Sequence, residues 1–95
     1  MTKRIVIVGA GIAGLAAARG AADSARGSDI EILLLESSPT VGGKAKTIRR
    51  GGWLLEAGPT GYLDSEPLMD TLVKAAGLTK IAADDAAARR FLVRN

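Results

Sequence analysis

Short apolar runs and one helical pattern organise the first third of the chain. Residues 3–8 are β-branched and apolar, which is typical of a buried strand in a parallel sheet. Residues 12–25 are rich in alanine and suit a helix close against a sheet, and residues 30–36 repeat the apolar strand pattern. Residues 3–36 therefore predict a βαβ unit and an α/β fold. The charged residues of the helix recur at spacings of four and three and mark a solvent-facing stripe: Arg19, Asp23 and Arg26.

The pattern changes in the middle of the chain, where strands become short and glycine turns frequent. Residues 47–56 predict a β-hairpin with Gly51 and Gly52 in its turn. Residues 66–76 predict a helix that is capped by Asp64 and Ser65. This helix has a proline in its first turn and a glycine just beyond its end. Its apolar face is expected to contain Leu68, Leu72 and Ala75 or Ala76.

The last part of the chain predicts less regular structure. Residues 82–90 are alanine-rich with charges of both signs, which indicates a short exposed helix or a linker. Residues 91–93 predict the start of a strand without a partner strand in the sequence. We therefore expect residues 1–95 to be the N-terminal part of a larger domain, with the substrate domain absent. Because a two-stranded parallel sheet leaves open edges and uncovered apolar faces, the chain alone is expected to be inactive and poorly stable.

The composition excludes several classes of function. A chain of 95 residues has room for one small domain, but not for a cofactor domain and a substrate domain together. It lacks cysteine and histidine, which removes thiolate chemistry, the usual general base and the commonest metal ligand. The net charge of +3 is mild, and one Trp, one Tyr and one Phe provide no stacking surface for nucleic acid. Any chemistry must come from a bound cofactor or from residues outside the chain.

The basic residues and the apolar run at the N-terminus resemble a secretory signal peptide. However, a signal core has no use for glycines at positions 9, 11 and 14, whereas a strand–turn–helix unit explains them. The sequence also has no uninterrupted apolar stretch of roughly 18 residues, the length of a membrane span. We therefore expect a cytoplasmic protein, in which any peripheral membrane contact is made by parts outside this chain.

The first candidate site is the glycine loop between the first strand and the helix. Its G-x-G-x-x-G pattern is formed by Gly9, Gly11 and Gly14, with Ile12 and Ala13 at the helix start. In such a loop the first glycine permits a tight turn, the second lets the backbone approach a pyrophosphate, and the third lets helix and strand pack closely. The start of the helix then presents N–H groups and partial positive charge to the pyrophosphate. The motif and its flanks predict a dinucleotide site, so residues 1–95 are expected to be the N-terminal part of an FAD- or NAD(P)-binding domain.

The second candidate site is the end of the second strand. Glu36 stands 22 residues after Gly14, where a carboxylate accepts hydrogen bonds from the adenosine ribose. The carboxylate would repel a 2′-phosphate, and Ser37 and Ser38 offer no arginine to bind one, so NADP is disfavoured. An ordinary solvated acid is the alternative interpretation of Glu36. At this point NAD and FAD fit the sequence equally well.

A second glycine loop distinguishes the two cofactors. Gly42, Gly43 and Lys44, with Thr47 shortly after them, resemble the G-G-[RK] loop of the amine-oxidase and protoporphyrinogen-oxidase flavoenzymes. In that family the basic residue lies near the cofactor, so the resemblance implies FAD. The family usually has an arginine two positions before the first glycine, where this chain has Thr40. The remaining basic residues are interpreted as a solvated hairpin edge: Lys46, Arg49 and Arg50.

A further segment also resembles these flavoenzymes. Residues 53–59 are similar to their L-E-A-G-P segment, which runs beside the flavin. Gly58 has no side chain to obstruct a planar ring, and Pro59 biases it to an extended shape. By the same resemblance Thr60 is assigned to the cofactor site. The alternative is a strand that ends in a rigid turn.

The whole chain resembles the protoporphyrinogen and coproporphyrinogen III oxidases. The later matching segments are 65–68, 76–78 and 88–94. The resemblance implies six-electron oxidation of a tetrapyrrole porphyrinogen in heme biosynthesis, with FAD as cofactor, CH–CH groups as donors and oxygen as acceptor. It implies no catalytic residue within these 95 positions. An amine oxidase, a carotenoid desaturase and a truncated, inactive dinucleotide-binding module remain alternatives.

Overall fold

A computed structural model describes residues 1–89 and 91–94 of the chain. The chain divides into two compact units, residues 1–61 and 62–95. The first unit contains β1 (Lys3–Val8), α1 (Ile12–Ser24), β2 (Ile30–Leu35), β3 (Thr47–Arg50) and β4 (Trp53–Glu56).

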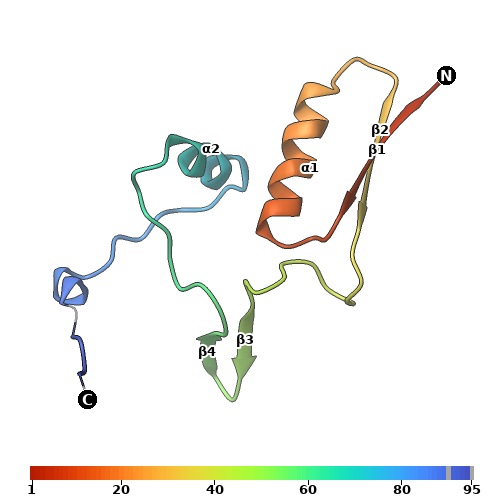
Figure 1. Ribbon diagram of the computed structural model, residues 1–95. Coiled ribbons are helices and arrows are strands. Elements are labelled where there is room, and N and C mark those ends of the chain that lie inside the picture. The colour runs from red at the N-terminus through yellow and green to blue at the C-terminus, as the bar shows by residue number, and fades with distance from the viewer. Residues whose placement is uncertain (90, 95) are drawn as a thin grey trace. The chain divides into compact units, whose positions relative to one another are not determined.

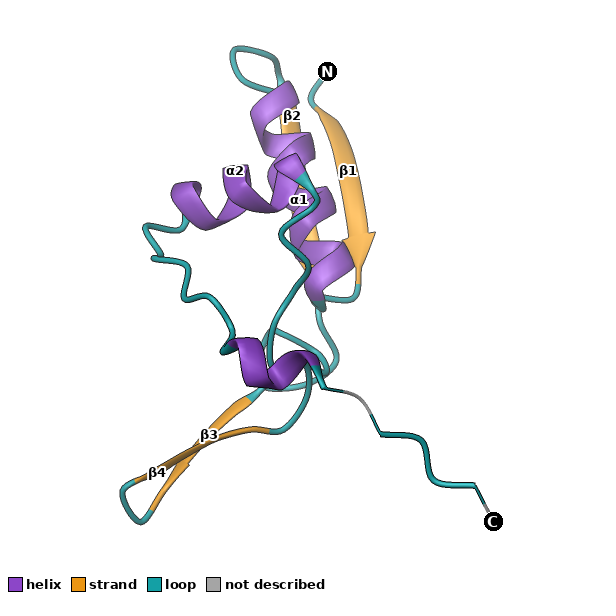
Figure 2. Cartoon of the chain, turned by 90° about the vertical axis from the view of Figure 1, so that its left-hand side faces the viewer, coloured by secondary structure: helices purple, strands orange, loops and turns teal. Residues whose placement is uncertain are grey.

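The first three elements form the expected βαβ unit (Figure 1). Strands β1 and β2 are parallel and in register from Lys3 opposite Ile30 to Val8 opposite Leu35. Helix α1 contacts both strands and lies along them in two perpendicular views (Figure 2). The predicted boundaries agree to within one residue: α1 ends at Ser24, one residue earlier than predicted, and β2 ends one residue before Glu36. This arrangement confirms a partial Rossmann-like α/β fold.

The charged stripe of α1 is also confirmed. Arg19 Nε donates to Asp23 Oδ2 at 2.7 Å, and Arg26 donates to Asp23 Oδ1 at 2.8 Å. The hydrogen bond from Arg19 is the main cause that holds the pKa of Asp23 below its usual range. These ion pairs lie on the exposed side of the helix, so they are expected to add little stability.

The expectation of a buried first strand is wrong for this chain. In β1, Val6 is 49% exposed and Val8 is 82% exposed. Alternate residues of β2 are half-buried, at Ile30, Ile32 and Leu34, while Leu33 and Leu35 are exposed. A single helix covers one face of a two-stranded sheet, and no described element covers the other. The apolar pattern thus identified the strand, but it did not show which elements pack against it.

The predicted hairpin forms with its expected turn (Figure 1). Strands β3 and β4 are antiparallel, with Thr47 opposite Glu56 and Arg50 opposite Trp53. Gly51 and Gly52 have φ of +57° and +81°, the left-handed conformations that a two-residue type I′ turn requires. Among the described residues, the hairpin contacts no other helix or strand. Within the same residues, no helix has the length and apolarity needed to cross a bilayer.

The second unit contains α2 (Pro67–Ala75) and a 3₁₀ helix (Asp85–Ala88). The predicted caps of α2 are wrong: Glu66 is the N-cap, and no side chain caps the helix. Asp64 and Ser65 lie too far upstream, because the helix begins at Pro67. The 3₁₀ helix agrees with the short exposed helix expected within residues 82–90, of which Arg90 lies outside the described residues.

Two further expectations for this unit are corrected. Leu68 is 72% exposed and Leu72 is 37% exposed, whereas Met69 and Val73 on the neighbouring side of α2 are half-buried. The predicted apolar face is therefore uncovered in this chain. Residues 91–93 form no strand, because they have no described strand to pair with.

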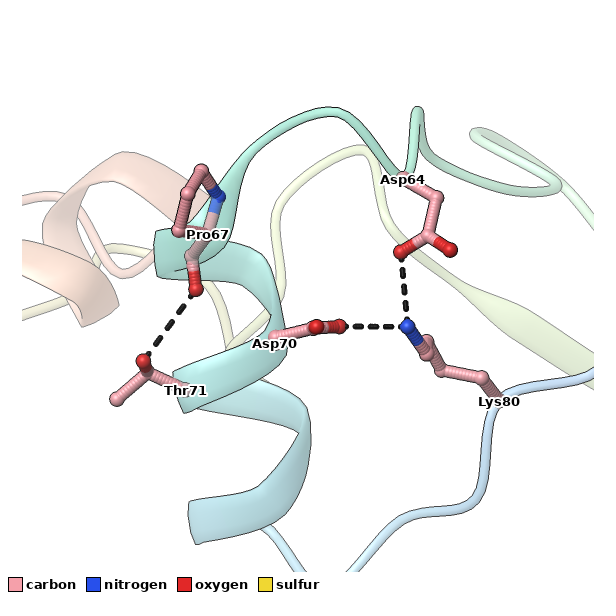
Figure 3. A network of polar contacts seen from close by, with 5 residues as sticks. All are labelled: Asp64, Pro67, Asp70, Thr71 and Lys80. Atoms are coloured by element: carbon pink, nitrogen blue, oxygen red, sulfur yellow. Dashed lines mark hydrogen bonds and ion pairs between the residues drawn. The ribbon is translucent and has the colours of Figure 1, made fainter.

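Asp64 instead takes part in a network around Lys80 (Figure 3). The Lys80 ammonium donates to Asp64 Oδ1 at 2.8 Å and to Asp70 Oδ1 at 2.7 Å. These hydrogen bonds, first that with Asp64, raise the pKa of Lys80, and the bond from Lys80 lowers the pKa of Asp70. The network ties the segment before α2 to the segment after it.

Replacing Lys80 with methionine should lower the melting temperature slightly, because the ammonium is lost and the aliphatic stem is kept. Because the pKa of Lys80 is raised, the stability that its ion pairs contribute is complete below pH 10.5 and is lost as the pH rises further. Because the pKa of Asp70 is lowered, the stability that its ion pair contributes is lost as the pH falls below 3.8. The melting temperatures of the natural protein and of the Lys80→Met variant are compared by thermal unfolding at low and high salt. The control is Lys3→Met, since Lys3 takes part in no ion pair within the described part of the chain. Equal effects of the two replacements would contradict the network's role.

Candidate functional site

The first glycine loop joins β1 to α1 and is held by close backbone packing. A Cβ atom on Gly14 would overlap the carbonyl oxygen of Gly9 and lie 2.9 Å from its carbonyl carbon. The helix begins at Ile12, and its first hydrogen bond runs from Leu15 N–H to Gly11 C=O at 3.0 Å. The N–H groups at positions 12–14 therefore have no acceptor within the helix. This is the geometry of an anion-binding helix N-terminus.

The outer side of the loop is open. A Cβ atom on Gly9 or Gly11 would meet no atom within 4 Å. The absence of a side chain at Gly11 thus leaves its backbone accessible, and the helix start beside it bears no side-chain cap. A pyrophosphate fits this donor set, because backbone N–H groups and the positive end of the helix dipole meet there. The residues present therefore fit a dinucleotide.

Glu36 lies directly beside this loop. Its Oε2 accepts from Ala10 N–H at 2.8 Å, and its Oε1 accepts from Ser38 N–H at 3.1 Å. The hydroxyls of Ser37 and Ser38 are each 3.4 Å from Oε1. The backbone hydrogen bonds, first that from Ser38 and then that from Ala10, lower the pKa of Glu36. Since a carboxylate oxygen accepts about two hydrogen bonds, Oε2 retains one acceptor position for a ligand hydroxyl.

The second glycine loop packs onto the first. Gly42 N–H donates to Ala10 C=O at 2.7 Å, and Gly42 forms a parallel bridge with Gly11. A Cβ on Gly43 would lie 3.1 Å from Gly11 Cα. Gly42 and Gly43 have φ of +115° and +60°, conformations that favour glycine. The two motifs, about 30 residues apart in the sequence, thus form one backbone cluster.

Ala10 is the site residue that the sequence did not single out. It is the one fully buried residue among those described. Its N–H donates to Glu36 and its C=O accepts from Gly42, so one residue links the strand-end acid to both glycine loops. Its position between two glycines of the motif is the only sequence signal for this role, and the signal does not reveal its partners.

The remaining predicted site residues are arranged less closely. Ile12 and Ala13 are exposed at the start of α1, and Lys44 is exposed after Gly43. Thr47 is the first residue of β3, and its hydroxyl donates to the Glu56 carboxylate at 2.9 Å. Gly58 lies against the carbonyl group of Lys44. The last two predicted site residues, Pro59 and Thr60, are exposed near the end of the first unit.

A shallow hollow of about 330 Å³ lies elsewhere, on the hairpin. Its lining consists of residues 49–54 and includes none of the glycines of the two loops. The hollow is therefore separate from the dinucleotide site, and its open, arginine-rich wall provides no enclosed place for a cofactor.

The lowered pKa of Glu36 predicts an acid-dependent loss of stability. The bonds to Ala10 and Ser38 favour the charged carboxylate, so their contribution is complete above its ordinary pKa of 4.5. The contribution is lost as pH falls through the lower pKa of the folded state. Urea midpoints measured from about pH 6 to about pH 3 should fall more steeply for the natural protein than for its Glu36→Gln variant. Parallel curves for the two proteins would contradict this assignment.

Comparisons with known proteins agree with this geometry. Residues 7–75 match the model of a family described as an NAD(P)-binding Rossmann-like domain. The chain is 35% identical over 95 residues to coproporphyrinogen III oxidase of Bacillus subtilis, covering 98% of this chain and 20% of that protein. It is 38% identical over 78 residues to an L-amino-acid oxidase of Demansia vestigiata, covering 80% of this chain and 14% of that protein.

A solved structure shows the same fold. A protein from Exiguobacterium sp. 255-15, provisionally described as a protoporphyrinogen oxidase, superposes with a TM-score of 0.70 and 43% identity. The match covers 81% of this chain and 17% of that protein, so the chain spans a fifth or less of the length of these relatives. The relatives are oxidases, and the matched region contains both glycine loops and Glu36. The family model matches well over half of this chain, and the chain therefore belongs to the NAD(P)-binding Rossmann-like domain family.

Proposed function

We propose that the polypeptide containing this chain binds FAD and oxidises a porphyrinogen, coproporphyrinogen III or protoporphyrinogen IX, to the porphyrin with oxygen as acceptor. The observation that carries the proposal is the hydrogen bond from Gly42 N–H to Ala10 C=O, which packs the second glycine loop onto the first. A second loop of this kind is the feature that separates the flavoenzyme resemblance from a plain NAD site. The names of the Bacillus and Exiguobacterium relatives support the choice of substrate.

The chain's own residues supply binding and orientation in this proposal. The free N–H groups at the start of α1 hold the pyrophosphate, and Glu36 accepts from a ribose hydroxyl through its remaining position on Oε2. Lys44 adds positive charge next to the second loop. FAD, when bound, supplies the two-electron oxidation chemistry that no side chain here provides. Three such oxidations would remove six hydrogens from the porphyrinogen to give the porphyrin, and three oxygen molecules would accept them as hydrogen peroxide.

The test uses the natural polypeptide that contains this sequence, purified with whatever flavin it carries. Reduced coproporphyrinogen and protoporphyrinogen are supplied separately in air, and porphyrin fluorescence is followed against a protein-free control. Fluorescence growth above the control rate is expected, and the faster substrate identifies the subfamily. A flavin-loaded protein that leaves both rates unchanged would exclude the porphyrinogen substrate.

A second candidate substrate is an L-amino acid, because several matched relatives are L-amino-acid oxidases, with up to 46% identity over 57 residues. Production of a 2-oxo acid and hydrogen peroxide from amino acids, without porphyrin formation, would favour it. A protein that holds no flavin and oxidises neither substrate class would instead indicate an inactive dinucleotide-binding module.

A further inference from the structure

Gly58, two residues beyond β4, is confined by the chain itself. A Cβ atom at this position would overlap the carbonyl oxygen of Lys44, and it would lie 2.9 Å from the Lys44 carbonyl carbon and 3.6 Å from Ala45 N. Gly58 is not among the glycines with positive φ, so its backbone conformation is open to other residues. The requirement for glycine here is one of space, and the group that takes the space is the Lys44–Ala45 peptide.

The other side of this peptide is fixed to the glycine loops. Ala45 N–H donates to Gly42 C=O at 3.1 Å, and Gly42 N–H donates to Ala10 C=O at 2.7 Å. Next to Gly58, Ala57 N–H donates to Lys46 C=O at 2.8 Å. An unbroken series of backbone contacts therefore runs from Gly58 through the Lys44–Ala45 peptide to the first glycine loop.

Lys44 carries the charge that a displacement of the Lys44–Ala45 peptide would move. Its side chain is exposed and forms no ion pair with the described residues. The segment 37–55 contains four basic residues and no acidic one, so its charge is not neutralised locally. The position of the Lys44 ammonium depends on the peptide from which the side chain projects. That peptide is held between Gly58 and Gly42.

We propose that Gly58 is a positioning residue for dinucleotide binding: it holds the Lys44–Ala45 peptide, and through it the Lys44 ammonium, in place beside the first glycine loop. The role rests on the proposed FAD site and makes it more specific. It differs from a glycine that merely leaves room for a flavin ring, because Gly58 acts through Lys44. The proposal therefore predicts that the two residues are energetically coupled.

The test measures FAD affinity of the apoprotein of the natural polypeptide by quenching of flavin fluorescence. Gly58→Ala should weaken binding about tenfold or more, because the overlap displaces the Lys44–Ala45 peptide. Gly61→Ala is the matched control, since a Cβ there meets no atom within 4 Å, and it should change affinity less than about twofold. An unchanged affinity of Gly58→Ala would overturn the proposal.

A double-mutant cycle separates positioning from general damage. In a Lys44→Met background, Gly58→Ala should lose most of its effect, because the charge that it displaces is already absent. Independent, additive losses would overturn the positioning role. The salt dependence of affinity should also decrease in both single variants, to a similar degree.

A third variant avoids the steric overlap in case Gly58→Ala does not fold. Ala45→Gly adds no atom and frees the peptide that Gly58 holds, so it should weaken FAD binding by about threefold or more. Unchanged affinity of this variant, beside an unfolded Gly58→Ala, would overturn the proposal. If the natural protein fails to bind FAD, the proposed function is wrong. If the natural protein binds FAD and the variants bind it with the same affinity, only the role of Gly58 is wrong.

Discussion

Replacing Gly14 with alanine is expected to reduce dinucleotide affinity by about 100-fold or more and to destabilise the fold by about 3 kcal/mol. The new Cβ would overlap the carbonyl oxygen of Gly9 within the loop that joins β1 to α1. Alanine favours a helix by about 1 kcal/mol over glycine, but this gain is smaller than the cost of displacing a backbone carbonyl. The start of α1 would move, and its free N–H groups would no longer converge on the pyrophosphate.

Gly20→Ala is the matched control on the same helix. A Cβ on Gly20 meets no atom within 4 Å, so only the helix propensity changes, and stability should rise by up to about 1 kcal/mol. FAD titration and urea unfolding of the two variants provide the comparison. If Gly14→Ala bound FAD as tightly as Gly20→Ala, the packing role assigned to Gly14 would be wrong.

The second large effect is expected for Glu36→Ala, which should weaken FAD binding by about 10- to 100-fold. The replacement removes the acceptor of the Ala10 and Ser38 N–H groups, as well as the acceptor proposed for the ribose. Ala10 is fully buried, so its N–H would lose its partner where water has little access. Both the position of the first loop and a direct ligand contact would be lost.

Two comparisons test this interpretation of Glu36 by FAD titration. Glu31→Ala removes an acid of β2, the strand that ends just before Glu36, and it should leave affinity unchanged, because Glu31 pairs with Arg4 on the surface at 2.6 Å. Glu36→Gln keeps one carbonyl acceptor and should bind with intermediate affinity. A loss for Glu31→Ala equal to that for Glu36→Ala would show that the effect is only one of net charge.

The parts of the fold that depend on local chemistry were predictable. The βαβ unit follows from two apolar runs around an alanine-rich helix, and the hairpin follows from Gly51 and Gly52 between two short strands. The two glycine loops were identified by residue type and spacing. Their mutual contact was not predicted, because the hydrogen bond from Gly42 to Ala10 depends on how β2 leads the chain back to the first loop.

The errors arose where long-range partners decide the outcome. Asp64 has the residue type of a helix cap, but it pairs with Lys80, 16 residues later, instead. Likewise, the apolar pattern of β1 identifies a strand, but the pattern cannot supply the elements that would cover it. The hydrogen bond from the Thr47 hydroxyl to Glu56 across the hairpin is a further contact that the sequence did not predict, and the assignment of Thr47 to the cofactor site stays a prediction. Local patterns therefore predicted the glycine loops and the strand-end acid, and tertiary contacts determined how they pack together.

The most direct test of the central claim is a titration of the apoprotein of the natural polypeptide with FAD, followed by competition with NAD⁺ and NADP⁺. We expect FAD to bind at micromolar concentration or below and not to be displaced by millimolar NAD⁺ or NADP⁺. Glu36→Ala and Gly14→Ala should both weaken this binding. Tight binding of NAD⁺ or NADP⁺ by a protein that does not bind FAD would contradict the assignment of FAD as the cofactor.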